Sequence, residues 1–176
     1  HQVAINLASL TFMMAVGVTQ AATILVGQAV GSGDAARARR SAGAGLVVVS
    51  VLMTVTGVTF LTLPGVLARV YTPDAAVVAL ATTLIPVAGI FQIFDGLQAV
   101  ASGVLRGVGD TFAPMIGNLI GFWLIGLPAS LYFGFTRGLG PLGLWWGMAV
   151  GLGAVAVALL IRVRIRFGRE LTRMTV

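Results

Sequence analysis

Five long apolar segments, separated by short polar breaks, make up most of the chain. They cover about residues 2–30, 36–63, 74–106, 112–135 and 141–166. Each contains the roughly 20 mainly apolar residues that an α-helix needs to cross the hydrocarbon core of a bilayer. No segment alternates strictly between apolar and polar residues, which disfavours a transmembrane β-barrel. The pattern therefore predicts an all-α, polytopic bundle of about five transmembrane helices.

The breaks between the segments contain residues that suit helix starts: Asp34, Thr72, Pro73, Asp110 and Thr111. Short polar side chains cap helices by accepting hydrogen bonds from the free backbone N–H groups of the first turn, and proline suits the first helical position. We therefore predict that Asp34 caps the second helix. Thr72 is the expected cap of the third helix, with Pro73 as its first residue.

One eight-residue pattern, GxxxGxGD, occurs twice, as GQAVGSGD at residues 27–34 and as GVLRGVGD at 103–110. Tight turns between helices often combine a glycine at the end of one helix with a capping aspartate at the start of the next, so convergence explains the likeness. A repeated helix–turn–helix unit, common in transporters, explains it equally well. A phosphate-binding nest is a third interpretation. Under either of the first two, both turns lie on the same side of the membrane.

Composition supports a membrane location and limits the kinds of functional site that the chain can form. Only 9% of the 176 residues are charged and 58% are hydrophobic, whereas soluble domains carry about 25% charged residues. Cysteine is absent and the single histidine is His1, which excludes thiolate metal sites and most histidine-based catalysis. No nucleophile–base pair or metal-ligand cluster stands out. We therefore expect neither an enzyme nor a bound cofactor.

The net charge of +6 arises from eleven arginines, with no lysine in the chain. The positions of these arginines predict the orientation of the chain in the membrane. If both GxGD turns and the C-terminus lie on one side, that side holds Arg37, Arg39, Arg40, Arg106, Arg162, Arg164, Arg166, Arg169 and Arg173, and the other holds Arg69 and Arg137. Cytoplasmic loops carry the excess of basic residues. The sequence therefore predicts a cytoplasmic C-terminus with a basic tail at 167–176, and no nucleic-acid partner. Five crossings that end inside begin outside, so a preceding helix is expected.

Of the five acidic residues, Asp34, Asp74 and Asp110 lie at expected helix starts and Glu170 lies in the basic tail, whereas Asp95 has no such explanation. It lies about eleven residues from the end of its segment, about 16 Å deep at 1.5 Å per residue. A charge at such a depth costs at least ~2.5 kcal/mol, so these groups usually face a protein interior or a water-filled pathway. A helical wheel places these residues on one face: Phe91, Asp95, Gln98, Ser102 and Arg106, with Gln92 at its edge.

The first segment has a matching polar face, formed by Gln2, Asn6, Ser9, Met13, Gly17 and Gln20. Two interpretations of the polar faces stay open. Their side chains either hydrogen-bond between helices and only fix the packing, or line a shared cavity.

In the last segment, Gly143, Gly147 and Gly151 recur every four residues, a spacing typical of close helix contact. We assign these glycines an architectural role.

Three stretches resemble the multidrug and toxic compound extrusion (MATE) family, in its NorM-like bacterial branch. They are HQVAINLASLTFMMAVGVTQAATILVGQAVGSGD, FQIFDGLQAVASGVLRGVGDTFAPM and GFWLIGLPASLYFGFTRGLGPLGLWWG. The resemblance covers nearly the whole chain in the family's order. It implies a twelve-helix fold with two six-helix lobes. Residues 1–166 resemble the C-terminal lobe without its first helix, so the N-terminal lobe is an expected partner.

The resemblance also implies a function and a site. Family members export bulky, often cationic and aromatic compounds across the bacterial cytoplasmic membrane, driven by inward flow of Na+ or H+. Asp95 matches the family's tenth-helix carboxylate, implicated in ion coupling and Na+ binding. Gln2 and Asn6 match polar positions that face the cavity, whereas Phe91 and Phe12 stand where some relatives have tyrosine. The seventh-helix acid that usually partners the aspartate is absent, so this stretch alone is not expected to transport.

The hypothesis is therefore an antiporter in which one carboxylate, Asp95, holds a proton, Na+ or a cationic drug in turn. The expected cavity-lining residues are Phe91, Gln92, Gln98, Gln2, Asn6 and Phe12. A flippase for lipid-linked precursors or polysaccharides, from the same wider superfamily, is the alternative and would be expected to carry several basic residues inside the cavity. A non-transporting membrane scaffold is a third hypothesis, although a scaffold would not require a buried Asp95.

Overall fold

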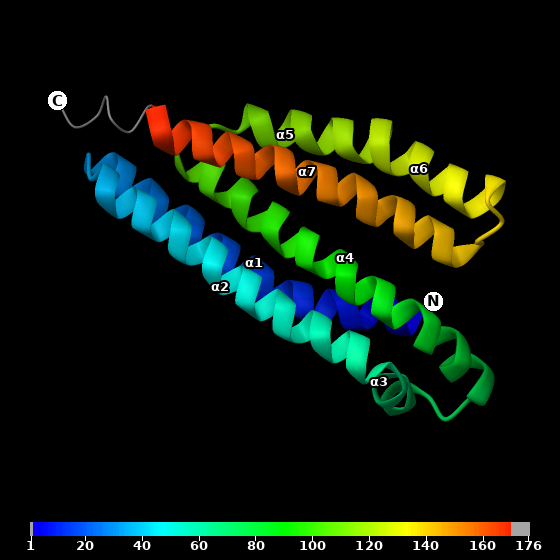
Figure 1. Cartoon of the computed structure of the whole chain (residues 1–176). Coiled ribbons are helices and arrows are strands. Elements are labelled where there is room, and N and C mark those ends of the chain that lie inside the picture. The colour runs from blue at the N-terminus through cyan, green and yellow to red at the C-terminus, as the bar shows by residue number, and fades with distance from the viewer. Residues whose placement is uncertain (1, 170–176) are drawn as a thin grey trace.

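The computed structural model describes residues 2–169, which form helices joined by short turns (Figure 1). In chain order the elements are α1 (Gln2–Gly31), α2 (Ala35–Thr62), α3 (Pro64–Tyr71), α4 (Ala75–Gly107), α5 (Phe112–Leu119), η1 (Ile120–Gly126), α6 (Leu127–Leu131), η2 (Tyr132–Thr136) and α7 (Pro141–Arg169). The two η elements are π-helical turns, so α5 to η2 form one continuous span. Within residues 2–169, five spans are long and apolar enough to cross a membrane. The predicted all-α bundle is confirmed.

The central helix is α4, which packs against α1, α2 and α7. Figure 1 shows α1 and α2 on one side of α4, and α7 with the α5–η2 span on the other. The side chains buried between these helices are aliphatic, with Met53, Leu105 and Leu152 fully enclosed. The outer surface is also apolar: Leu124 is 69% exposed and Phe135 is 75% exposed. An apolar outer surface around an apolar interior is what a bilayer requires.

The two GxGD turns have the same structure. Gly33 and Gly109 adopt left-handed φ angles of 72° and 80°. The N–H groups of Asp34 and Asp110 donate to carbonyls five residues back, those of Ala29 and Leu105, at 2.9 Å each. These are Schellman motifs, in which only glycine avoids a steric penalty at the left-handed position. Both turns lie at the end of the bundle where α7 finishes (Figure 1).

Each turn's aspartate also caps the next helix. The Oδ1 atom of Asp34 accepts from the Arg37 N–H at 2.8 Å, and that of Asp110 accepts from the Ala113 N–H at 3.2 Å. This double use of one residue accounts for the glycine and aspartate at both positions. The shared geometry fits convergence on a capped turn and a repeated helix–turn–helix unit equally well.

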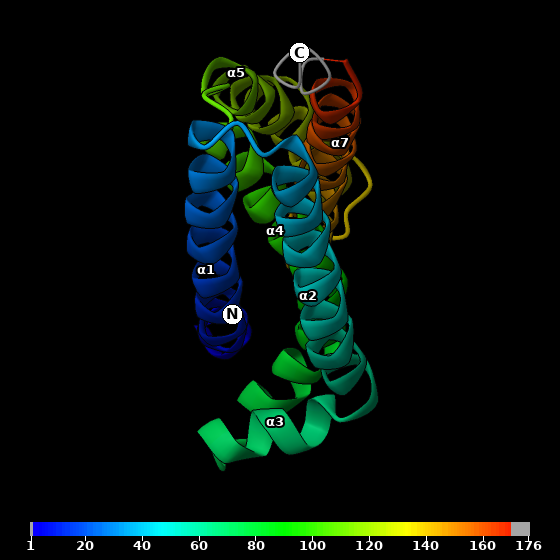
Figure 2. The same ribbon diagram turned by 90° about the vertical axis from the view of Figure 1, so that its left-hand side faces the viewer.

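The connection from α2 to α4 differs from the prediction in two ways. Residues Pro64–Tyr71 form a short helix, α3, which lies across the ends of the long helices (Figure 2). The cap of α4 is Asp74, whose Oδ1 accepts from the N–H groups of Ala76 and Val77 at 2.9 and 3.4 Å. The expected cap, Thr72, accepts from the Asp74 N–H instead, and Pro73 precedes the helix. At the other end of the chain, α7 continues to Arg169, into the predicted tail; residues 170–176 lie outside the described part.

The predicted close contact at the glycines of α7 is confirmed. A Cβ atom on Gly151 would lie 2.5 Å from the Cα of Gly126, and one on Gly147 would collide with the backbone of Ser130. A Cβ on Gly143 would likewise meet the backbone of Phe133. The absence of side chains at these three positions therefore lets α7 lie directly against the η1–α6–η2 stretch.

Candidate functional site

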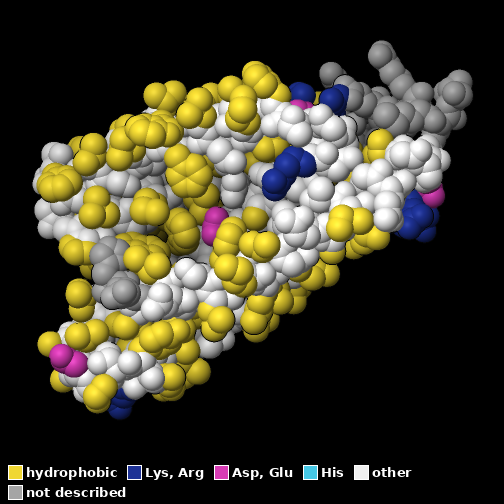
Figure 3. All heavy atoms as spheres, turned by 180° about the vertical axis from the view of Figure 1, so that it is seen from behind, with side chains coloured by type: hydrophobic (Ala, Val, Ile, Leu, Met, Phe, Trp, Pro, Cys, Tyr) yellow, Lys and Arg dark blue, Asp and Glu magenta, His cyan; other side chains and the backbone are white. Residues whose placement is uncertain are grey.

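A cavity of 720 Å³ opens between α1, α4, α7 and the η1–α6 stretch. It is lined by Ile5, Ala8, Ser9, Phe12, Met13, Phe91, Asp95, Phe122, Gly126, Leu127, Ser130, Leu144, Trp145 and Met148. Figure 3 shows an acidic side chain in a hollow bordered mainly by hydrophobic groups. We call this space the Asp95 cavity. Its volume lies within the range of sites for drug-sized ligands, roughly 300–1,000 Å³.

The packing of α4 directs Asp95 into this cavity. The next residue, Gly96, is buried, and a Cβ there would lie 2.5 Å from the Met53 side chain of α2. Gly89, two turns earlier, makes a similarly close approach to Phe60 of α2. Because these glycines bring one face of α4 against α2, the flank that carries Asp95 faces α1 and α7. Asp95 forms no hydrogen bond or ion pair with any other described residue, which argues against a purely structural role.

Aromatic and methionine side chains surround the carboxylate. Phe91, one turn before Asp95, meets Trp145 of α7 edge to face, with ring centroids 5.7 Å apart and an interplanar angle of 81°. Phe12 and Met13 of α1 form the opposite wall. Aromatic faces attract organic cations, and thioethers adapt to ligands of varied shape. The cavity therefore combines one acidic group with an adaptable apolar surface.

Phe91, Phe12 and Asp95 thus lie together in one cavity, but Gln92 does not line it. Gln92 is 2% exposed. Its Oε1 accepts from Thr11 Oγ1 of α1 at 2.6 Å, and its Nε2 donates to Thr56 Oγ1 of α2 at 3.0 Å. The expected cavity role of Gln92 is therefore corrected: its amide joins α1, α4 and α2 inside the bundle.

Gln98 lines a separate pocket of 390 Å³ rather than the Asp95 cavity. Its Nε2 donates to Asn118 Oδ1 of α5 at 2.6 Å. Ser102 and Arg106 line the same pocket, and Phe12 borders both spaces. The polar stripe expected along α4 is therefore divided, with Asp95 in one space and Gln98, Ser102 and Arg106 in the next.

The two remaining predicted residues lie at the start of α1. Asn6 is exposed on α1 and does not line the Asp95 cavity. The side chain of Gln2 is outside the described part of the chain, so its role stays a prediction. Sequence reasoning also missed Trp145 of α7, which is 6% exposed and forms part of the cavity wall.

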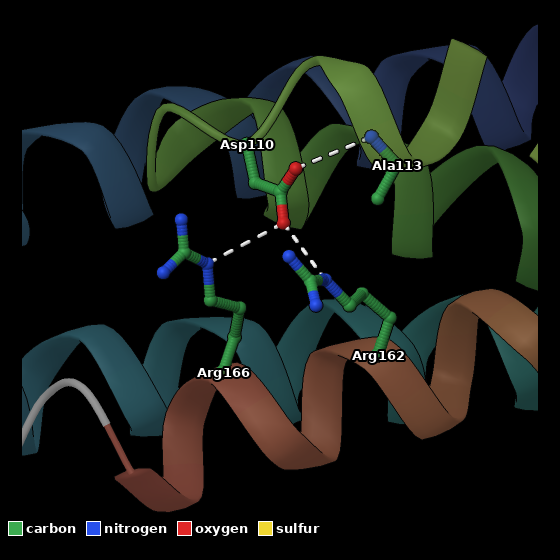
Figure 4. Close-up of polar contacts among 4 residues, drawn as sticks. All are labelled: Asp110, Ala113, Arg162 and Arg166. Carbon is green, nitrogen blue, oxygen red and sulfur yellow. Dashed lines mark hydrogen bonds and ion pairs between the residues drawn. The ribbon is translucent and has the colours of Figure 1, made fainter. Parts of the chain in front are cut away.

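A cluster of charged side chains surrounds Asp110, the aspartate of the second GxGD turn (Figure 4). Asp110 is 6% exposed, and its Oδ2 contacts the Nε atoms of Arg162 and Arg166 at 2.9 and 3.4 Å. Burial opposes ionisation of Asp110. The Ala113 N–H and the two guanidinium groups outweigh burial and hold the pKa of the carboxyl below its ordinary value. This ion-pair cluster ties the α4–α5 turn to α7.

Asp110→Asn is expected to lower the free energy of unfolding by about 1–3 kcal/mol at pH 7, because asparagine still caps α5 but loses two charge-assisted contacts. Since the native pKa is lowered, the ion-pair cluster stabilises the fold above the unfolded pKa of about 3.9. Its contribution is lost as the pH falls through the native pKa. Thermal melts in detergent at pH 7 and pH 3 measure the difference in stability between the wild type and Asp110→Asn. Asp34→Asn is the control, because Asp34 caps the equivalent turn and has no ion pair with a described residue. Equal shifts for both variants at pH 7 would refute the role of the ion-pair cluster.

Comparison with known proteins gives several matches. The family model described as MatE matches residues 1–131. The "Multidrug resistance protein NorM" of Burkholderia vietnamiensis is 39% identical over 171 residues, which are 94% of this chain and 37% of that protein. A "Probable multidrug resistance protein NorM" of Brucella suis biovar 1 is 42% identical over 170 residues, 93% of this chain and 36% of that protein. The chain therefore spans well under half the length of these relatives.

Solved structures match over almost the whole chain. The "Crystal structure of eukaryotic MATE transporter AtDTX14" aligns with a TM-score of 0.89 and 25% identity, covering 98% of this chain and 39% of that one. An inward-facing multidrug resistance MATE family transporter of the MOP superfamily aligns with a TM-score of 0.85 and 15% identity, covering 98% and 40%. The helices of this chain are therefore arranged as in part of those larger folds.

Proposed function

Because the chain belongs to the MatE family, whose model matches residues 1–131, we propose that it forms part of a drug antiporter. The antiporter exports organic cations and other drugs across the bacterial cytoplasmic membrane in exchange for Na+ or H+. The names of the NorM relatives support drug export. The observation that carries the proposal is Asp95, the only charged residue among those that line the cavity, without a partner among the described residues.

A cationic aromatic drug suits this cavity on physical grounds. Its charge is attracted by the Asp95 carboxylate, and the apolar surroundings strengthen that attraction relative to water. Its rings can stack against Phe91 and Trp145, while Met13 and Met148 adjust to different shapes. Few of these contacts depend on directional hydrogen bonds, so substrates that differ in detail can bind.

Coupling follows from the single carboxylate. Asp95 can hold a proton, a Na+ ion or a drug cation, but two of these cannot occupy it together at full affinity. Entry of the small cation from outside therefore displaces the drug, and alternating access of the site to the two sides turns displacement into transport. Phe91 supplies no hydroxyl oxygen. Besides the carboxylate of Asp95, the side-chain oxygens among the described residues that line the cavity are the hydroxyls of Ser9 and Ser130.

The proposal also includes the orientation of the chain in the membrane and the lobe that it pairs with. The GxGD turns and the end of α7 share one end of the bundle, and most of the arginines fall at this end, which we assign to the cytoplasm. An N-terminal lobe of the same protein would close the cavity from the opposite side. The flippase alternative is not favoured, because the residues that line the Asp95 cavity include no arginine.

Transport by the full-length protein in liposomes tests the proposal. An imposed Na+ gradient at constant pH, or a pH gradient without Na+, should drive ethidium against its concentration gradient. The gradient that works identifies the coupling ion. If the protein is folded and neither gradient moves ethidium, secondary antiport is refuted.

A further inference from the structure

A third hollow lies between α2 and α7, close to the end of the bundle that carries the GxGD turns. It has a volume of 420 Å³, and we call it the α2–α7 groove. Two arginines and a set of small or apolar residues line it, among them Arg39, Gly43, Leu46, Val163, Arg164 and Phe167. It shares no lining residue with the Asp95 cavity.

The positive charge in this groove is not neutralised by the described chain. Arg39 donates from Nε to the backbone oxygen of Phe167 at 3.0 Å, which holds its guanidinium against the last turns of α7. Neither Arg39 nor Arg164 forms an ion pair with a described carboxylate, whereas Arg162, two residues before Arg164, pairs with Asp110. Two uncompensated guanidinium groups that border one groove favour an anionic occupant.

The groove changes from charged to apolar along the helix axes. Arg39 lies in the second turn of α2, and Leu46, seven residues further, is about 10 Å closer to the middle of the bundle. Between them, Gly43 leaves open space, since a Cβ at this position would meet no atom within 4 Å. On α7, Val163 continues the apolar floor. A free phosphate would use only the charged end, whereas a phospholipid matches both ends.

We propose that the α2–α7 groove binds an anionic phospholipid. Its phosphate lies between Arg39 and Arg164, and one acyl chain follows Gly43, Leu46 and Val163. Basic pockets between transmembrane helices at the membrane surface are suited to acidic headgroups. The site is independent of the proposed transport function, because no residue of the Asp95 cavity takes part in it.

Native mass spectrometry of the full-length protein in detergent tests this proposal. Phosphatidylglycerol is compared with phosphatidylcholine of the same chain length and with inorganic phosphate. We expect preferential retention of phosphatidylglycerol, weakened about fivefold by Arg39→Gln or Arg164→Gln and about 30-fold by both, as one charge contact near the headgroups is lost each time. Arg37→Gln is the matched control, because Arg37 lies on the same helix end outside the groove.

A further variant separates lipid binding from loss of fold. Gly43→Leu keeps both charges and fills only the apolar floor, so it should weaken phosphatidylglycerol binding while the protein still melts like the wild type. The proposal is overturned if the double arginine variant retains phosphatidylglycerol as well as Arg37→Gln does. It is equally overturned if phosphate competes as strongly as the lipid, or if the groove variants change the oligomeric state and leave lipid binding unaltered.

Discussion

Asp95→Asn is expected to reduce ethidium efflux from energised cells to the background of cells without the protein. Asparagine has nearly the same shape, so the cavity keeps its walls. The amide, however, cannot bind a proton or carry the charge that attracts Na+ and drug cations. Because Asp95 is the only charged group among the described residues that line the cavity, none of those residues can replace it.

The matched control for this variant is Asp74→Asn. Asp74 is exposed and caps α4, and asparagine caps helices equally well, so efflux should be unchanged. Membrane levels and melting temperature of both variants should equal those of the wild type. Undiminished efflux by Asp95→Asn would remove Asp95 from the transport mechanism.

Gly147→Leu is expected to prevent folding of the bundle. No space exists for a side chain at this position, since even a Cβ collides with the Ser130 backbone. Separation of α7 from α6 would also open the wall formed by Trp145. Overpacking by a few atoms costs about 1–3 kcal/mol, so Gly147→Ala should already lower the melting temperature measurably.

The matched control is Gly17→Ala on α1, where a Cβ would meet no atom within 4 Å. This change should leave the melting temperature unchanged or slightly higher, because alanine favours helices more than glycine does. Size-exclusion profiles and thermal melts in detergent measure the folding and stability of Gly147→Leu, Gly147→Ala and Gly17→Ala. A Gly147→Ala variant as stable as Gly17→Ala would contradict the close contact.

The five transmembrane helices were predictable because bilayer-length apolar runs are a strong local signal. The helix α3 was not, since eight residues provide too few turns to show a period. The start of α4 was misplaced because Thr72 and Asp74 are both suitable caps. Which of them meets the free N–H groups depends on the path of the chain after α3, and the sequence does not specify that path.

The candidate site was predictable only in part, because a helical wheel orders the faces of α4 but not its neighbours. The wheel grouped Asp95 with Gln98, yet α5 takes Gln98 into a hydrogen bond with Asn118. Gln92 stood at the edge of the same face and is held by Thr11 and Thr56. The contact between Asp110 and Arg162 joins residues 52 positions apart, beyond any local pattern.

Competition at Asp95 is the central claim, and ethidium binding to the purified full-length protein tests it most directly. The dissociation constant is measured by fluorescence over a range of Na+ concentration and pH, for the wild type and for Asp95→Asn. We predict that the coupling ion weakens ethidium binding to the wild type competitively and has no effect on the variant. Binding to the wild type that is independent of both Na+ and pH would contradict the account.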